Sequence, residues 1–104
     1  MLLSTTFDIP GRKVKENLGI VEGSVVRARH IGRDIVAALK NLIGGEIASY
    51  TELLEQSRKD ALDRMIKQAE NLNADAIIGV RFHTSSLMQG ASEILVYGTA
   101  VYVE

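Results

Sequence analysis

The chain has 104 residues, a formal net charge of −1 at pH 7 and no cysteine. A chain of this length predicts one domain, residues 1–104. The absence of cysteine excludes disulfides, thiolate metal sites and thiol catalysis, and the near-neutral charge argues against a nucleic-acid-binding or membrane-surface protein. No segment has the apolar core of a signal peptide or approaches the ~20 apolar residues of a membrane span, so we expect a cytoplasmic protein.

The N-terminal third is predicted to be β-structure. Residues 2–7 form a short strand that ends before a Pro-Gly turn. Residues 13–30 mix β-branched and polar side chains, which fits one long strand bent at Gly19 and Gly23, or a hairpin that turns at the second of these glycines. We favour the bent strand, because a β-branched pair resumes the pattern directly afterwards.

Two helices are predicted in the middle of the chain. Residues 31–45 have apolar side chains at three- and four-residue spacing and end at a pair of glycines. The second helix is expected from about residue 50 to 72, with Ser49 and Glu52 as a capping box. It has one apolar stripe and, on its outer face, acidic–basic pairs four residues apart. The stripe consists of Leu54, Ala61, Leu62, Met65, Ala69 and Leu72, and the pairs are Glu55–Lys59, Asp60–Arg64 and Asp63–Lys67.

Two strands, residues 74–85 and 92–103, follow the second helix and are expected to pair antiparallel because their connection is short. Alternation in the first of them predicts two faces. Ala76, Ile78, Val80 and Phe82 are expected to face the helix, and Ile77, Gly79, Arg81 and His83 to face away. Each strand matches the second helix in length, so we expect an α+β fold of two layers, a mainly antiparallel sheet packed on helices.

The last strand is apolar on both faces, and one helix layer covers only one of them. Ile94, Val96, Ala100 and Tyr102 lie on one side, and Leu95, Tyr97, Val101 and Val103 on the other. Leaving such side chains in water forgoes about 1.5–3 kcal/mol each. Because an exposed apolar face on a small domain marks a partner surface, we predict a homo-oligomer with the second set at its interface.

Several short motifs, in their order and spacing, resemble the YbjQ-like family of small bacterial proteins, which carries a heavy-metal-binding label. The resemblance covers nearly the whole chain. The matching pieces are "STT" (4–6), "GIVEG" (19–23), "RD" (33–34), "GG" (44–45), "SY" (49–50), Arg58 with Ala61 and Met65, "ADAIIGV" (74–80) and "GTAV" (98–101). The resemblance implies a dodecin-like subunit with a β-α-β-β core that assembles into a pentameric ring, and it defines no metal ligand set.

Candidate metal ligands are sparse, with two histidines and no thiol, which argues against a soft-metal site. His30 and Asp34 stand four residues apart and would share one helix face. A divalent-metal site would need His83, or ligands from neighbouring subunits, to complete it. The alternative interpretation is that Asp34 complements the helix dipole and that His83 contacts solvent or a subunit interface.

A second candidate site is basic. Arg27, Arg29 and Arg33 precede and enter the predicted helix 31–45, where free backbone amides favour an anion. The alternative is that they are solvated charges, partly paired with nearby carboxylates. An aromatic content of 5% and the slightly acidic balance argue against nucleic acid as the ligand.

Signs of catalysis are missing from the sequence. No nucleophile motif accompanies either histidine, and the glycine pair at 44–45 lacks the Lys-Ser/Thr of a phosphate loop. We therefore predict a non-enzymatic, cytoplasmic, ring-forming module that binds a divalent metal ion or a small ligand in the assembled state. The alternatives are a purely structural scaffold and an anion-binding protein.

Overall fold

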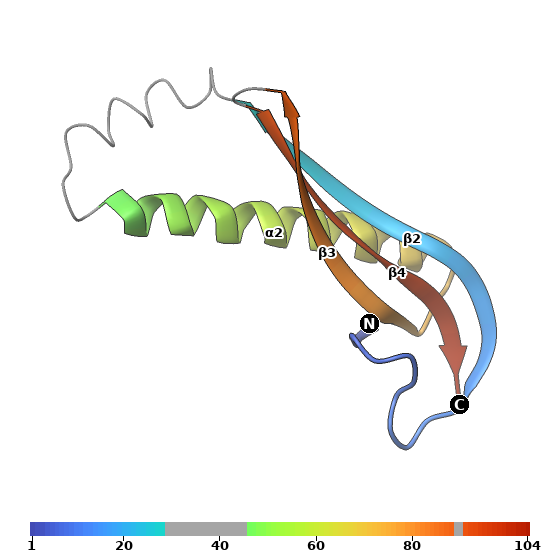
Figure 1. Cartoon of the computed structure of the whole chain (residues 1–104). Coiled ribbons are helices and arrows are strands. Elements are labelled where there is room, and N and C mark those ends of the chain that lie inside the picture. The colour runs from blue at the N-terminus through green and yellow to red at the C-terminus, as the bar shows by residue number, and fades with distance from the viewer. Residues whose placement is uncertain (29–45, 89–90) are drawn as a thin grey trace.

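The computed structural model describes residues 1–28, 46–88 and 91–104, and these form one helix packed on a four-stranded sheet (Figure 1). The elements are β1 (Leu2–Leu3), β2 (Val14–Ala28), α2 (Glu46–Asn71), β3 (Ala76–Met88) and β4 (Ala91–Val103). This two-layer α+β arrangement confirms the predicted fold class. The predicted helix 31–45 lies outside the described residues. No helix in the described ranges is long and apolar enough to cross a membrane.

The strand order in the sheet is β1-β3-β4-β2. The central strand β4 pairs antiparallel with both β3 and β2, whereas β1 runs parallel to β3. Strand β1 is shorter than the predicted strand 2–7, yet the chain after it stays on the edge of β3. The Ser4 amide donates to the Ile77 carbonyl at 2.9 Å, and the Gly79 amide donates to the Thr6 carbonyl at 2.8 Å. The N-terminal segment therefore covers the outer edge of β3 as far as Val80.

Strand β2 is one continuous bent strand, which confirms the favoured prediction over the hairpin. Its pairing with β4 shifts register between Asn17 and Gly19, where Gly19 has φ 110 and its amide donates to Asn17 Oδ1 at 2.8 Å. Gly23 has a different role from the predicted one. A Cβ atom at this position would clash with the Ala61 carbonyl and lie 2.6 Å from the Met65 amide nitrogen. Gly23 therefore allows helix α2 to pack directly against the strand backbone.

Helix α2 packs on the sheet through residues spaced four apart. Ser57, Ala61, Met65 and Ala69 are all fully buried, as expected for one stripe of a 3.6-residue helix. The helix begins at Glu46, so the prediction that Ser49 caps it is wrong. At the other end, Asn73 adopts φ 58, and the Ala74 amide donates to the Ala69 carbonyl at 3.0 Å, which closes the last turn.

Strand β3 does not present the predicted faces. The prediction that Ala76 and Ile78 face the helix is wrong, because both side chains pack on the opposite side of the sheet. Ile77, which was expected to face away, lies in the cluster against α2. Gly79 has φ 61, and the pairing with β4 shifts register between Ile78 and Arg81. This β-bulge reverses the alternation, so Val80 joins the helix-facing cluster as predicted.

The core consists of two clusters on opposite faces of the sheet. The larger lies between α2 and the sheet and includes Met65, Ile77 and Val96. The smaller lies at the other face, where Ala76, Ile78 and Val101 pack with Ile9, Val14 and Val103. The N-terminal segment thus covers one end of the face that α2 leaves open.

The Cα radius of gyration is 17.0 Å, against about 13 Å for a compact domain of this length, so the subunit is elongated.

Candidate functional site

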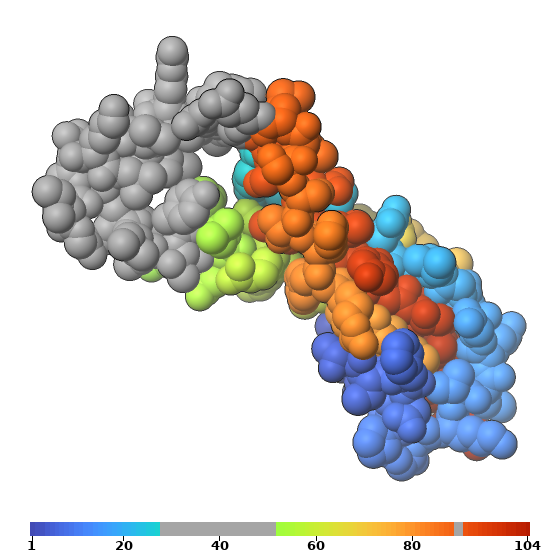
Figure 2. Space-filling model, viewed as in Figure 1, coloured from blue at the N-terminus to red at the C-terminus, as the bar shows by residue number. Residues whose placement is uncertain are grey.

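The face of the sheet that points away from α2 is the main candidate surface, and we call it the outer face. The strand registers place three rows of side chains across it. The rows are Glu22–Tyr97–Arg81, Ser24–Leu95–His83 and Val26–Glu93–Ser85, with Ile20 beside Thr99 at the next position. Figure 2 shows β3, β4 and β2 side by side on this face, with the N-terminal segment in blue at its lower end.

Large apolar side chains remain exposed on the outer face. Ile20 is 79% exposed, Val26 50% and Tyr97 40%, and Leu95 between them is half-buried. The described residues place no second layer over these four side chains. Because exposed apolar patches of small proteins are often interaction sites, these residues make the outer face the candidate binding surface.

Two of the four predicted interface residues lie within this open area, Leu95 and Tyr97. Val101 does not, because its own chain covers it to 1% exposure within the smaller core cluster. Val103 packs half-buried against the same cluster. The prediction that the whole face is open is wrong at its lower end, because the segment around Ile9 folds over it.

Arg81 lies at the β3 edge of the outer face and fixes the N-terminal segment there. Its Nη1 atom donates to the Thr5 carbonyl at 2.8 Å, and its guanidinium carbon lies 5.6 Å from the centroid of the Phe7 ring, a cation–π distance. The ring itself is 76% exposed. Phe7 therefore stands out from the surface beside a positive charge.

The predicted metal ligands are not brought together. His83 is exposed on the outer face, opposite Leu95 of β4, whereas His30 and Asp34 lie outside the described residues. Within residues 1–28, 46–88 and 91–104, no three His, Asp or Glu side chains gather as metal ligands would. With no thiol in the chain, the donor set in this part does not fit a heavy metal held by a single subunit.

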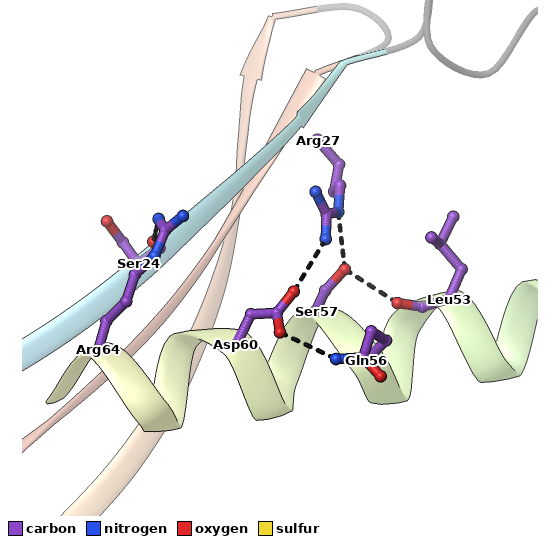
Figure 3. Close-up of polar contacts among 7 residues, drawn as sticks. All are labelled: Ser24, Arg27, Leu53, Gln56, Ser57, Asp60 and Arg64. Carbon is purple, nitrogen blue, oxygen red and sulfur yellow. Dashed lines mark hydrogen bonds and ion pairs between the residues drawn. The ribbon is translucent and has the colours of Figure 1, made fainter. Parts of the chain in front are cut away.

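Arg27, the one predicted anion ligand that the structure describes, faces α2 (Figure 3). Its Nε donates to Ser57 Oγ at 2.8 Å, and its Nη2 lies 3.4 Å from Asp60 Oδ2. Ser57 Oγ in turn donates to the Leu53 carbonyl at 2.9 Å. These contacts account for Arg27 without an anion. The other two candidates, Arg29 and Arg33, lie outside the described residues.

The polar contacts between α2 and β2 were not predicted from the sequence. The predicted Asp60–Arg64 pair is not formed, because Asp60 contacts Arg27 and Arg64 donates to the Ser24 carbonyl. Gln68 Oε1 accepts from the Glu22 amide at 2.9 Å. Gln68 and Arg64 each satisfy one backbone group at the open edge of β2. The spacing of Ser57 from Ala61 and Met65 was the available signal that this serine faces the sheet.

Comparisons with known proteins agree with the resemblance seen in the sequence. The family model YbjQ_1, described as "Putative heavy-metal-binding", matches residues 1–104. The chain is 57% identical over 104 residues to a UPF0145 protein of Thermotoga maritima, covering 100% of this chain and 98% of the relative. It is 55% identical over 104 residues to a UPF0145 protein of Hahella chejuensis, covering 100% of both.

A solved structure shows the same fold. It is a crystal structure of a protein of unknown function of the DUF74 family from Pediococcus pentosaceus, with a TM-score of 0.64 and 21% identity, covering 100% of this chain and 98% of that chain. The names of these relatives assign no enzymatic reaction.

Proposed function

Because the chain belongs to the YbjQ family, whose description names heavy-metal binding and no reaction, we propose that it is a structural module that works as a homo-oligomer. In this proposal the module is a cytoplasmic ring of identical subunits, with the outer face turned toward neighbouring copies. Five subunits is the number that the family resemblance implies.

The observation that carries the proposal is the uncovered outer face. Ile20, Val26 and Tyr97 expose apolar surface on one side of a sheet whose other side packs on α2. Covering each such side chain contributes about 1.5–3 kcal/mol at most. That gross gain offsets a large part of the cost of association. The elongated shape, with a radius of gyration of 17.0 Å, leaves much of the surface free to form contacts.

The edge of β2 supports assembly through side chains rather than through a continued sheet. Its backbone is already satisfied at Glu22 by Gln68 and at Ser24 by Arg64. Edge strands protected in this way resist pairing with a second chain. These two contacts support our proposal that copies meet through the outer face and its flanks.

Native mass spectrometry of the full chain tests the proposal. A ring of five subunits of 11.4 kDa has a mass of five times that value, 57 kDa. We expect this mass at micromolar protein concentration, and light scattering in solution should agree. A chain that remains at 11.4 kDa over a hundredfold range of concentration would contradict the proposal.

A divalent metal ion or small ligand bound in the assembled state is the second candidate function. His83 favours it, because this imidazole is exposed on the outer face, where a neighbouring copy could supply further ligands. A panel of Zn²⁺, Ni²⁺, Co²⁺ and Cu²⁺ should then raise the melting temperature of the wild type with increasing concentration, and His83→Ala should abolish the shift. A wild type whose melting temperature does not change with any of the four metals would contradict the metal function. The anion alternative retains only Arg29 and Arg33, since Arg27 is engaged by α2.

A further inference from the structure

Among the residues whose burial the structure describes, the two most exposed large apolar side chains lie at opposite edges of the sheet. Ile20 is 79% exposed on β2, and Phe7 is 76% exposed where the N-terminal segment covers β3. The Phe7 ring rests against Gly79, where a Cβ atom would lie 3.1 Å from it. Both positions flank the outer face, so each subunit presents two separate apolar contact points.

A charge of opposite sign accompanies each of these points. Glu22 follows Ile20 by two residues on the same face of β2, and Arg81 holds its guanidinium over Phe7. Among the described residues, the one ion pair joins Arg27 and Asp60, so neither Glu22 nor Arg81 is neutralised there by an opposite charge. We call Ile20 with Glu22 the acidic patch, and Phe7 with Arg81 the basic patch.

We infer that neighbouring copies join head to tail, with the acidic patch of one subunit on the basic patch of the next. This inference rests on the proposed homo-oligomer and names its contact. The two patches are complementary in charge, and each is apolar at its centre. Because they lie at opposite edges of one sheet, each subunit keeps one free patch after one contact forms, the basic patch in one subunit and the acidic patch in the other. Such heterologous contacts close into a ring when the rotation between subunits allows it.

A symmetric contact of like patches is disfavoured by the same charges. Two acidic patches would place Glu22 against Glu22, and two basic patches would place Arg81 against Arg81. Like charges brought together at an interface cost several kcal/mol of binding free energy and suppress that pairing. The head-to-tail contact instead pairs Glu22 with Arg81 and Ile20 with Phe7.

Mixing two assembly-deficient variants tests this arrangement. Ile20→Asp leaves the basic patch intact, and Phe7→Asp leaves the acidic patch intact. We expect each variant alone to lose the wild-type assembly, with at least a tenfold weaker self-association, and to appear at 11.4 kDa. A mixture of the two retains one productive contact, so it should form a complex of two chains, twice 11.4 kDa or 22.8 kDa, and nothing larger.

Charge reversal provides an independent check at exposed positions. Glu22→Arg and Arg81→Glu should each weaken assembly at least tenfold, and the double variant should recover it because the pair is restored with reversed sign. Met88→Asp is the matched control, since Met88 is 68% exposed but lies outside both patches, and its mass should equal that of the wild type. Circular dichroism spectra of all variants should overlay that of the wild type.

The possible failures are distinguishable. A monomeric wild type would overturn the proposed homo-oligomer together with this contact. A wild-type oligomer whose mass survives both Ile20→Asp and Phe7→Asp would overturn the head-to-tail contact alone. A mixture that yields no 22.8 kDa complex would also overturn it, because the two intact patches would then not bind each other.

Discussion

The two faces of the same sheet differ in what covers them, although their strands have similar apolar content. On the helix side of β4, Ile94, Val96 and Ala100 are all buried under α2. On the outer side, Tyr97 is exposed and Leu95 half-buried. Burial in this protein is therefore set by the neighbouring layer rather than by the composition of the strand.

The faces also differ in how closely they can be approached. Under α2, small residues such as Ala61 and Gly23 bring the helix backbone into contact with β2. On the outer face, beyond the end that the N-terminal segment covers, large side chains such as Ile20 and Tyr97 are exposed. Substitutions should therefore be costly on the helix side of an isolated subunit and cheap on the outer side, where their effect should depend on protein concentration.

The largest effect is expected at Gly23. In Gly23→Val, the new side chain meets the backbone around Ala61 and Met65, which cannot move without displacing α2. We expect a loss of more than about 3 kcal/mol in the free energy of unfolding, at or beyond the upper end of overpacking effects. Urea denaturation followed by circular dichroism measures it. Ile20→Val, on the outer side of the same strand, is the control, and at concentrations where the chain is monomeric it should change stability by less than about 0.5 kcal/mol.

Truncation of one large side chain on each face tests the comparison directly. Met65→Ala removes a fully buried side chain beside α2, and should cost about 3 kcal/mol, within the range for buried methionine. Tyr97→Ala on the outer face should cost less than about 1 kcal/mol at concentrations where the chain is monomeric. Urea titrations measure both, at a concentration where native mass spectra show a monomer and at one a hundredfold higher. Equal losses at the lower concentration would show that the outer face is not uncovered in the subunit.

The main elements could be predicted from the sequence because their signals are local. The stripe of α2, the short connection between β3 and β4 and the β-branched pattern of β2 each depend on residues close in the chain. The faces of β3 could not be predicted, because Gly79 with positive φ reverses the alternation and nothing in the pattern marks a bulge there. That register is set by pairing with β4, which is a tertiary effect.

The candidate site was less predictable because it depends on contacts between distant residues. Leu95 and Tyr97 follow from strand alternation alone. The burial of Val101 required knowing that Ile9 folds back over the sheet, more than ninety positions away in sequence. The position of Phe7 beside Arg81 has the same origin, since no periodicity relates the N-terminal segment to β3.

Gly79→Ala tests whether the β-bulge in β3 depends on glycine. An alanine at φ 61 adopts the left-handed region at a cost of about 1–2 kcal/mol, and its Cβ would also lie 3.1 Å from the Phe7 ring. In the Phe7→Ala background the contact with the ring is absent, so thermal denaturation of Gly79→Ala there measures the cost of the backbone conformation alone. If Gly79→Ala were neutral in both backgrounds, the bulge would not depend on glycine.

The smallest expected effect concerns the polar contact that ties β2 to α2. Ser57→Ala removes the acceptor of Arg27 Nε and should cost about 1 kcal/mol of the free energy of unfolding.

A double-mutant cycle of Arg27→Gln with Asp60→Asn should give a coupling free energy below about 1 kcal/mol, because both side chains of this pair are more than a third exposed. That coupling should fall further in 1 M NaCl, whereas the Arg27–Ser57 coupling should persist, since the serine carries no charge. If Arg27 bound an anion instead, added phosphate would stabilise the wild type but not Arg27→Gln, and the interpretation of Arg27 as a link between helix and sheet would be wrong.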